Sequence, residues 1–106
     1  MKHMHWVILL CCTFWNVSIL AADKPIAMQA RDMATEVCAG CHGTDGFSQA
    51  EDFPRLAGQK QTYLTKQLKD FRDGRRKDPL MSPMAVSLSD QIIESLALHF
   101  STRKSR

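Results

Sequence analysis

Runs of valine, isoleucine and aromatic residues, which favour β-strands, are scarce in this sequence once its first 22 residues are set aside. A strong excess of basic residues is also missing, because 14 lysines and arginines stand against 11 aspartates and glutamates. The one long apolar run, residues 6–20, is interrupted by Asn16 and Ser18 and is short for a membrane span. These scarcities argue against a sheet-based fold and against nucleic acid as a partner.

The first 22 residues have the pattern of a secretory signal peptide. Lys2 gives a positive start, the apolar run follows, and Ala21 and Ala22 offer small residues for cleavage. The pattern therefore predicts export, with an uncleaved leader acting as a membrane anchor as the alternative. Cleavage would leave one domain, residues 23–106, with 13 basic and 11 acidic residues and a formal charge of +2.

The two cysteines of this domain, Cys38 and Cys41, are three positions apart, and His42 follows directly. A Cys-x-x-Cys-His sequence is the signature of c-type haem attachment. On a helix the two sulfurs lie on one face about one turn apart, so both can add to the vinyl groups on one porphyrin edge. His42 then lies beneath the iron. Ala39 and Gly40 are small enough to let the backbone approach the macrocycle closely.

A zinc half-site and a redox-active dithiol are the alternative interpretations of this spacing. Zinc usually takes four ligands, and His99 is the only other histidine beyond the leader. A dithiol oxidoreductase needs strands that the sequence does not supply. The remaining cysteines, Cys11 and Cys12, leave with the leader, so no disulfide framework is expected. Haem is favoured, and it would supply much of the core that a domain of about 84 residues lacks.

Apolar periodicity predicts three helices. The first runs from residue 27 through the cysteines, and its buried face is expected to hold Ala30, Met33, Ala34, Val37, Cys38 and Cys41. Residues 43–58 are expected to form a loop. A middle helix is expected over residues 59–73, ended by Gly74. Ser89 is expected to cap a last helix, whose buried stripe holds Ile92, Ile93, Leu96, Ala97 and Phe100.

The loop after the cysteines carries Pro54, whose carbonyl could accept a hydrogen bond from the outer ring nitrogen of His42 and fix its tautomer. An ordinary turn-forming role for this proline is the alternative. The apolar side chains Phe47, Phe53 and Leu56 are expected to pack under the loop, against the porphyrin where haem is bound.

Basic residues cluster where the middle helix ends. Arg72, Arg75, Arg76 and Lys77 are expected to form a solvated helix terminus, where positive charge suits the helix dipole. A clamp on a haem propionate and a docking site for a partner are the alternatives. His99, near the end of the last helix, is expected to be a surface or half-buried residue and not a ligand.

Two methionines stand in residues 80–84, Leu-Met-Ser-Pro-Met, a segment expected to be irregular because prolines bias their predecessors toward extended backbone. A haem bound by His42 on one face still lacks a sixth ligand. The intervening chain is long enough to reach the other face, so the predicted ligand is Met81 or Met84.

Four stretches in order, CAGCHGTDG, FPRLAGQ, YLTKQLKDFRDGRR and LMSPMAVSLSDQIIESLALHF, resemble the class I cytochromes c of bacteria. The resemblance is closest to one half of the dihaem cytochrome c4 type, and the chain looks like a single-haem, cytochrome c553-like protein. It implies an all-α fold of three to four short helices around one covalently bound haem c. It further implies that Pro54 orients His42, and that the methionine ligand stands seven residues before Leu88, which selects Met81.

The resemblance implies haem c attached to Cys38 and Cys41, with His42 and Met81 as iron ligands. With both axial positions filled, the expected function is electron transfer, not enzymatic catalysis. The expected partners are periplasmic or membrane-bound oxidases, reductases or dehydrogenases, and no small-molecule substrate is expected. The alternative is a haem-bearing subunit or enzyme, such as a peroxidase or a dehydrogenase-associated protein, in which the sixth ligand can open. Because bacterial thioether attachment takes place outside the cytoplasm, the expected location is the periplasm.

Overall fold

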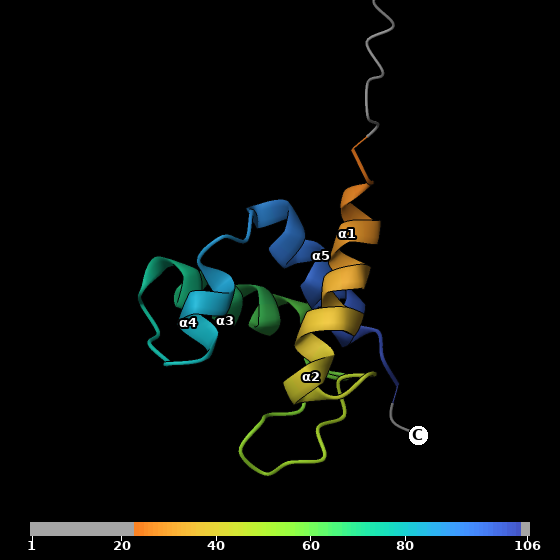
Figure 1. Cartoon of the computed structure of the whole chain (residues 1–106), viewed down its shortest axis with the longest axis vertical. Coiled ribbons are helices and arrows are strands. Elements are labelled where there is room, and N and C mark those ends of the chain that lie inside the picture. The colour runs from red at the N-terminus through yellow and green to blue at the C-terminus, as the bar shows by residue number, and fades with distance from the viewer. Residues whose placement is uncertain (1–22, 105–106) are drawn as a thin grey trace, which may run out of the picture.

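The computed structural model describes residues 23–104, and the predicted signal peptide, residues 1–22, lies outside them. Between residues 23 and 104 every regular element is helical, which confirms the predicted all-α class (Figure 1). The elements are α1 (Ile26–Met33), η1 (Ala34–Cys38), α2 (Ala39–His42), α3 (Gln61–Asp73), α4 (Met81–Ala85) and α5 (Asp90–Ser101). None of the helices in the described part of the chain is long and apolar enough to span a membrane.

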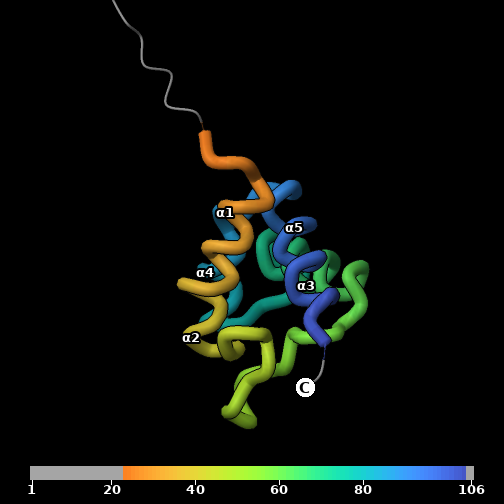
Figure 2. The backbone as a smooth tube through the Cα atoms, turned by 90° about the vertical axis from the view of Figure 1, so that its right-hand side faces the viewer, coloured from red at the N-terminus to blue at the C-terminus, as the bar shows by residue number. Residues whose placement is uncertain are grey.

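The first three elements follow one another without a break and form a single rod that crosses α5 (Figure 2). Small side chains make this crossing close. Ala30 and Ala34 on the rod are 1% and 0% exposed, and Ala97 on α5 is 0% exposed. Because no bulky side chain separates the backbones at these positions, the two helices can pack at short interaxial distance.

The core lies between this rod, α3 and α5. Ile93 and Leu96 of α5 are the largest side chains that are fully buried, and α3 adds Leu64 and Phe71. Full burial of an isoleucine or leucine side chain contributes about 1.5–3 kcal/mol. The apolar stripe predicted for the last helix therefore forms the centre of the domain.

Helix ends match the sequence signals closely. The Ile92 backbone N–H donates to Ser89 Oγ at 3.2 Å, which confirms Ser89 as the cap of α5. Gly74 ends α3 in the left-handed conformation, with φ of 80°. Helix α3 begins at Gln61, two residues later than predicted, because Lys60 has an extended backbone.

The predicted buried face of the first helix is wrong at Val37, which is 46% exposed. The reason is the π-helical turn η1, in which the Ala39 N–H bonds to the Ala34 carbonyl five residues back. A π turn holds more residues than an α turn, so the positions after Ala34 leave the register that a 3.6-residue period predicts. Val37 consequently turns outward.

Candidate haem site

The two cysteines lie at the end of the rod, at the margin of the core. Cys38, the last residue of η1, is half-buried and packs against the core, and burial raises the pKa of its thiol. Cys41, on α2, is exposed, so the expectation that the helix places both cysteines on the buried face holds only for Cys38.

His42 is the last residue of α2 and is only 6% exposed. Its Nδ1 lies 2.8 Å from the Pro54 carbonyl oxygen. Because a carbonyl oxygen can only accept, Nδ1 carries the proton and donates it, which leaves the lone pair of Nε2 for a metal. The hydrogen bond predicted between these two residues is therefore present. Phe53 contacts the imidazole edge to face, with ring centroids 6.4 Å apart.

Glycines bring Pro54 to the histidine. Gly43 directly follows α2 with φ of 83°, and a Cβ there would stand 2.4 Å from the Phe47 carbonyl oxygen. Gly46 then accepts hydrogen bonds at its carbonyl from the Leu56 and Ala57 backbone N–H groups, at 2.9 and 3.0 Å. These contacts fold the loop back under the end of α2, as the trace in Figure 1 shows.

The three apolar side chains of the loop have separate surroundings. Leu56 packs against the core, and Phe53 lies beside His42. The guanidinium of Arg55 lies over the ring of Phe47, 4.5 Å from its centroid. The prediction that these residues pack under the loop is confirmed for Leu56, while the face of the Phe47 ring is covered by the guanidinium of Arg55.

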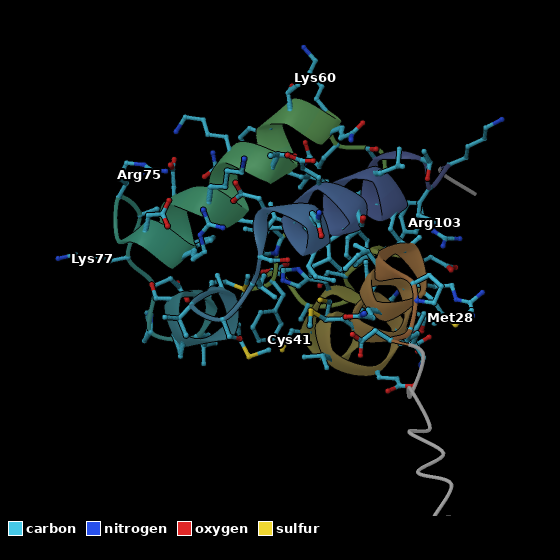
Figure 3. The ribbon with its side chains drawn as sticks, turned by 90° about the horizontal axis from the view of Figure 1, so that it is seen from above. Met28, Cys41, Lys60, Arg75, Lys77 and Arg103 are labelled. Atoms are coloured by element: carbon cyan, nitrogen blue, oxygen red, sulfur yellow. The ribbon has the colours of Figure 1, made fainter. Side chains whose placement is uncertain are left out.

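The prediction that the segment carrying the methionines is irregular is wrong. Residues 81–85 form α4, and Pro83 falls in its first turn, where a missing N–H is tolerated. Met81 is half-buried and packs against the core, whereas Met84 is 47% exposed. Seen from above, α4 and the rod lie on the same side of α3 and α5, with the Cys41 side chain between them (Figure 3).

Sequence reasoning overlooked Asp78, whose carboxylate lies at the start of α4. Its Oδ1 accepts from the backbone N–H groups of Leu80 and Met81, each at 2.8 Å. The hydrogen bond from the Met81 N–H has the largest effect in lowering the pKa of Asp78, and the one from the Leu80 N–H lowers it further. The signal that could have revealed it is an Asp before a Pro, because an Asp side chain in a turn can accept from backbone N–H groups two and three residues further on.

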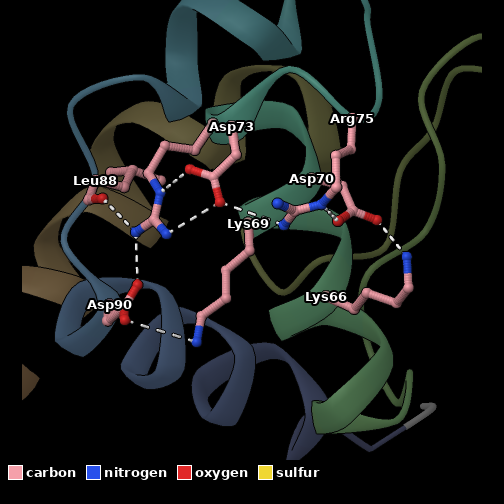
Figure 4. A network of polar contacts seen from close by, with 8 residues as sticks. Lys66, Lys69, Asp70, Asp73, Arg75, Leu88 and Asp90 are labelled. Carbon is pink, nitrogen blue, oxygen red and sulfur yellow. Dashed lines mark hydrogen bonds and ion pairs between the residues drawn. The ribbon is translucent and has the colours of Figure 1, made fainter.

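The basic cluster after α3 is not simply solvated. Arg72 donates to Asp73, to Asp90 of α5 at 2.6 Å and to the Leu88 carbonyl at 3.2 Å (Figure 4). Arg75 and Lys66 both bind the buried carboxylate of Asp70 and are drawn in the same view. The network ties the C-terminal end of α3 to the N-terminal end of α5.

Lys66 and, to a smaller extent, Arg75 lower the pKa of Asp70, because each donates to the charged carboxylate.

His99 is half-buried, as expected, and its ring meets the Phe100 ring edge to face, with centroids 5.0 Å apart. Burial, followed by the charge of Arg103, lowers the pKa of His99.

These residues fit a covalently bound haem. Cys38 and Cys41 present two thiols about one helical turn apart, and His42 has one ring nitrogen bonded and the other available. A methyl group built on Gly40, between the cysteines, would meet nothing within 4 Å, so that surface is open. Within residues 23–104, no group of three or more His, Cys, Asp or Glu side chains gathers as zinc ligands would.

Known proteins match this chain over most of the described range. The family model Cytochrome c matches residues 27–98. Cytochrome c4 of Pseudomonas aeruginosa is 43% identical over 84 residues, covering 79% of this chain and 40% of that protein. The thiosulfate dehydrogenase electron acceptor of Stutzerimonas stutzeri is 39% identical over 101 residues, covering 92% and 47%. The chain therefore spans less than half the length of these two relatives.

The fold agrees with the sequence match. The crystal structure of reduced cytochrome c4 from Pseudomonas stutzeri superposes with a TM-score of 0.68 at 32% identity, covering 74% of this chain and 48% of that one. The match to one half of a longer protein agrees with the resemblance seen in the sequence. The chain belongs to the cytochrome c family, and Cys38, Cys41 and His42 stand at the positions of its motif for covalently bound haem c.

Proposed function

We propose that this protein is a periplasmic electron carrier with one haem c, attached to Cys38 and Cys41 and bound at iron by His42 and Met81. The observation that carries the proposal is the hydrogen bond between His42 Nδ1 and the Pro54 carbonyl, 2.8 Å long, on a ring that is 6% exposed. It fixes the tautomer and the orientation that an iron ligand needs.

The proposal assigns the sixth ligand to Met81 and not to Met84. Both stand on α4, but Met81 is half-buried against the core, while Met84 is 47% exposed. A ligand must point toward the cofactor side of the domain, and Figure 3 places α4 on the same side as the helix that carries Cys41. The resemblance to the cytochromes c supports the same choice, because Met81 stands seven residues before Leu88.

Two protein ligands on one iron leave no position for a substrate, and this favours electron transfer. A bound haem c supplies the one-electron couple, and a thioether ligand in an apolar setting raises its reduction potential. The chain contributes His42 and Met81 as fixed ligands and a low-polarity surrounding. Because the ligand set need not change with the charge of the iron, the protein has little to reorganise when an electron arrives or leaves.

The axial assignment is tested by the absorption spectrum of protein made in a host that attaches haem c. We expect the oxidised protein to show the far-red band of a sulfur–iron bond. The band should be lost in Met81→Ala and kept in Met84→Ala, a matched control on the same short helix. A band that persists in Met81→Ala would refute the ligand assignment, and absence of covalent haem would refute the function.

The relatives point to a class of partner. One relative is named as the electron acceptor of a thiosulfate dehydrogenase, and another as the cytochrome subunit of a sulfide dehydrogenase. For this chain we infer a redox enzyme as donor, with a second redox protein as acceptor. Stopped-flow reduction of the oxidised holoprotein by a candidate dehydrogenase tests the inference, with Met81→Ala as the variant whose altered couple should change the rate. Direct turnover of the substrate by the cytochrome alone would instead support the alternative, in which the sixth ligand opens.

A further inference from the structure

The N-terminal end of α4, which carries the proposed methionine ligand, is held by one side chain. Asp78 Oδ1 accepts from the N–H groups of Leu80 and Met81, at 2.8 Å each. Ser82 closes the turn from the other side, because the Asp78 N–H donates to Ser82 Oγ at 2.9 Å and the Ser82 N–H donates to the Asp78 carbonyl at 3.0 Å. Four hydrogen bonds thus join Asp78 to three of the next four residues.

Helix α4 depends on these bonds more than a longer helix would. It has five residues, and helices this short are not stable by themselves in water. Its N–H groups all fall within the first turns, where an α-helix offers them no acceptor of its own, so few backbone bonds stabilise it. The side chain of Asp78 therefore supplies a large share of what orders the turn.

The two ends of α4 are held in different ways. At the C-terminal end, Ala85 is 0% exposed and Leu88, just beyond it, is 8% exposed, so burial anchors that end. At the N-terminal end, Leu80 is 58% exposed, so packing there is limited to the half-buried Met81, and the Asp78 carboxylate holds the backbone. Removing the Asp78 carboxylate would release the end that carries Met81 and leave the other end in place.

We propose that Asp78 is a positioning residue that holds Met81 where its sulfur can bind the haem iron, by capping the first turn of α4. This inference rests on the proposed role of Met81 as the sixth ligand. It adds to that role a reason why a methionine on one helical turn keeps a fixed place. Asp78 itself does not touch the haem in this scheme and acts only through the backbone of Leu80 and Met81.

The test titrates oxidised holoprotein with imidazole, which competes with the methionine for iron, while the far-red sulfur–iron band is recorded. Loss of a helix cap costs about 1 kcal/mol, so Asp78→Ala should bind imidazole about fivefold more tightly than the unmodified protein. Asp78→Asn should retain nearly the original affinity, because its side-chain oxygen can still accept from both amides.

Ser89→Ala is the matched control, because it deletes the cap of α5, a hydrogen bond in which no residue of α4 takes part. It should lower thermal stability and leave imidazole affinity unchanged. An unchanged affinity in Asp78→Ala, with the band lost in Met81→Ala, would overturn the positioning role while the ligand assignment stands. A band kept in Met81→Ala would overturn the ligand assignment, and the positioning role with it.

A second variant keeps the test decisive if Asp78→Ala does not mature. Ser82→Ala removes only the Ser82 hydroxyl, which accepts from the Asp78 N–H. A smaller rise in imidazole affinity than the fivefold change is expected for it and would support the proposal. An affinity equal to that of the unmodified protein in Ser82→Ala would then count against it.

Discussion

Replacement of Gly46 by alanine should destabilise the domain strongly, because this glycine stands where the loop between α2 and α3 meets α5. Its φ is 79°, a left-handed conformation that side chains disfavour. A Cβ at this position would stand 2.8 Å from Cδ1 of Phe100 and 2.9 Å from the Ala57 nitrogen. The second contact is with backbone, which cannot rotate away, so the loop or the helix has to move.

Two effects add in Gly46→Ala. The left-handed conformation costs an alanine roughly 1–2 kcal/mol. Displacing Phe100, which is 4% exposed, adds an overpacking cost of roughly 1–3 kcal/mol. The expected loss is therefore roughly 2–5 kcal/mol, a large part of the stability of a domain this size, which is roughly 4–12 kcal/mol at 0.05–0.15 kcal/mol per residue.

Gly74→Ala is the control that separates these effects. Gly74 has φ of 80°, nearly the same conformation, but a Cβ there would meet nothing within 4 Å. It should lose only the conformational part, roughly 1–2 kcal/mol. Urea unfolding of both holoproteins, followed by helical circular dichroism, gives the two free energies. Equal losses in the two variants would refute the argument that the contact with α5 fixes the loop.

Two further predictions concern charged groups. Burial and Arg103 hold the pKa of His99 below its ordinary value of 6.5, so the unfolded chain takes up this proton more readily than the folded one. The stability that neutral His99 contributes is therefore complete above pH 6.5 and is lost as the pH falls through the pKa of the folded protein. Between about pH 7 and about pH 5, the urea midpoint of His99→Gln should drop less than that of the unmodified protein. Arg72→Lys keeps the charge but cannot reach Asp73, Asp90 and the Leu88 carbonyl together, so its thermal midpoint should fall, and an unchanged midpoint would show that charge alone suffices.

The parts of the site that depend on neighbours in sequence could be predicted. The spacing of Cys38, Cys41 and His42 follows from the helical repeat, and Ser89 and Gly74 follow from the chemistry of helix ends. Pro54 was a less direct case, because the loop between it and His42 could have taken many paths. Its hydrogen bond could be predicted because Pro54 keeps its carbonyl and matches the proline that orients the histidine in the family that the sequence resembles.

The parts of the structure that depend on helical register or on contacts between distant residues could not be predicted from the sequence. Val37 turns outward because a single π turn changes the register, and no residue type announces such a turn. Arg72 meets Asp90 across 18 positions, so this ion pair becomes visible only when α3 and α5 are placed side by side. The prediction of an irregular segment at residues 80–84 is wrong for another reason: a proline biases its predecessor toward extended backbone, but the first turn of a helix accepts Pro83.

The two proposed iron ligands are held in place by hydrogen bonds to the backbone. His42 is fixed by a backbone carbonyl from a loop, and the proposed ligand Met81 stands on one helical turn that a single carboxylate caps. Neither of these hydrogen bonds involves a side chain of the tightly packed centre around Ile93, where the alanine-rich crossing sets the fold. Removal of the Asp78 carboxylate should therefore alter the iron ligands before it unfolds the domain. Substitutions at the crossing should instead unfold the domain and release both ligands together, so imidazole affinity and unfolding free energy should separate the two kinds of variant.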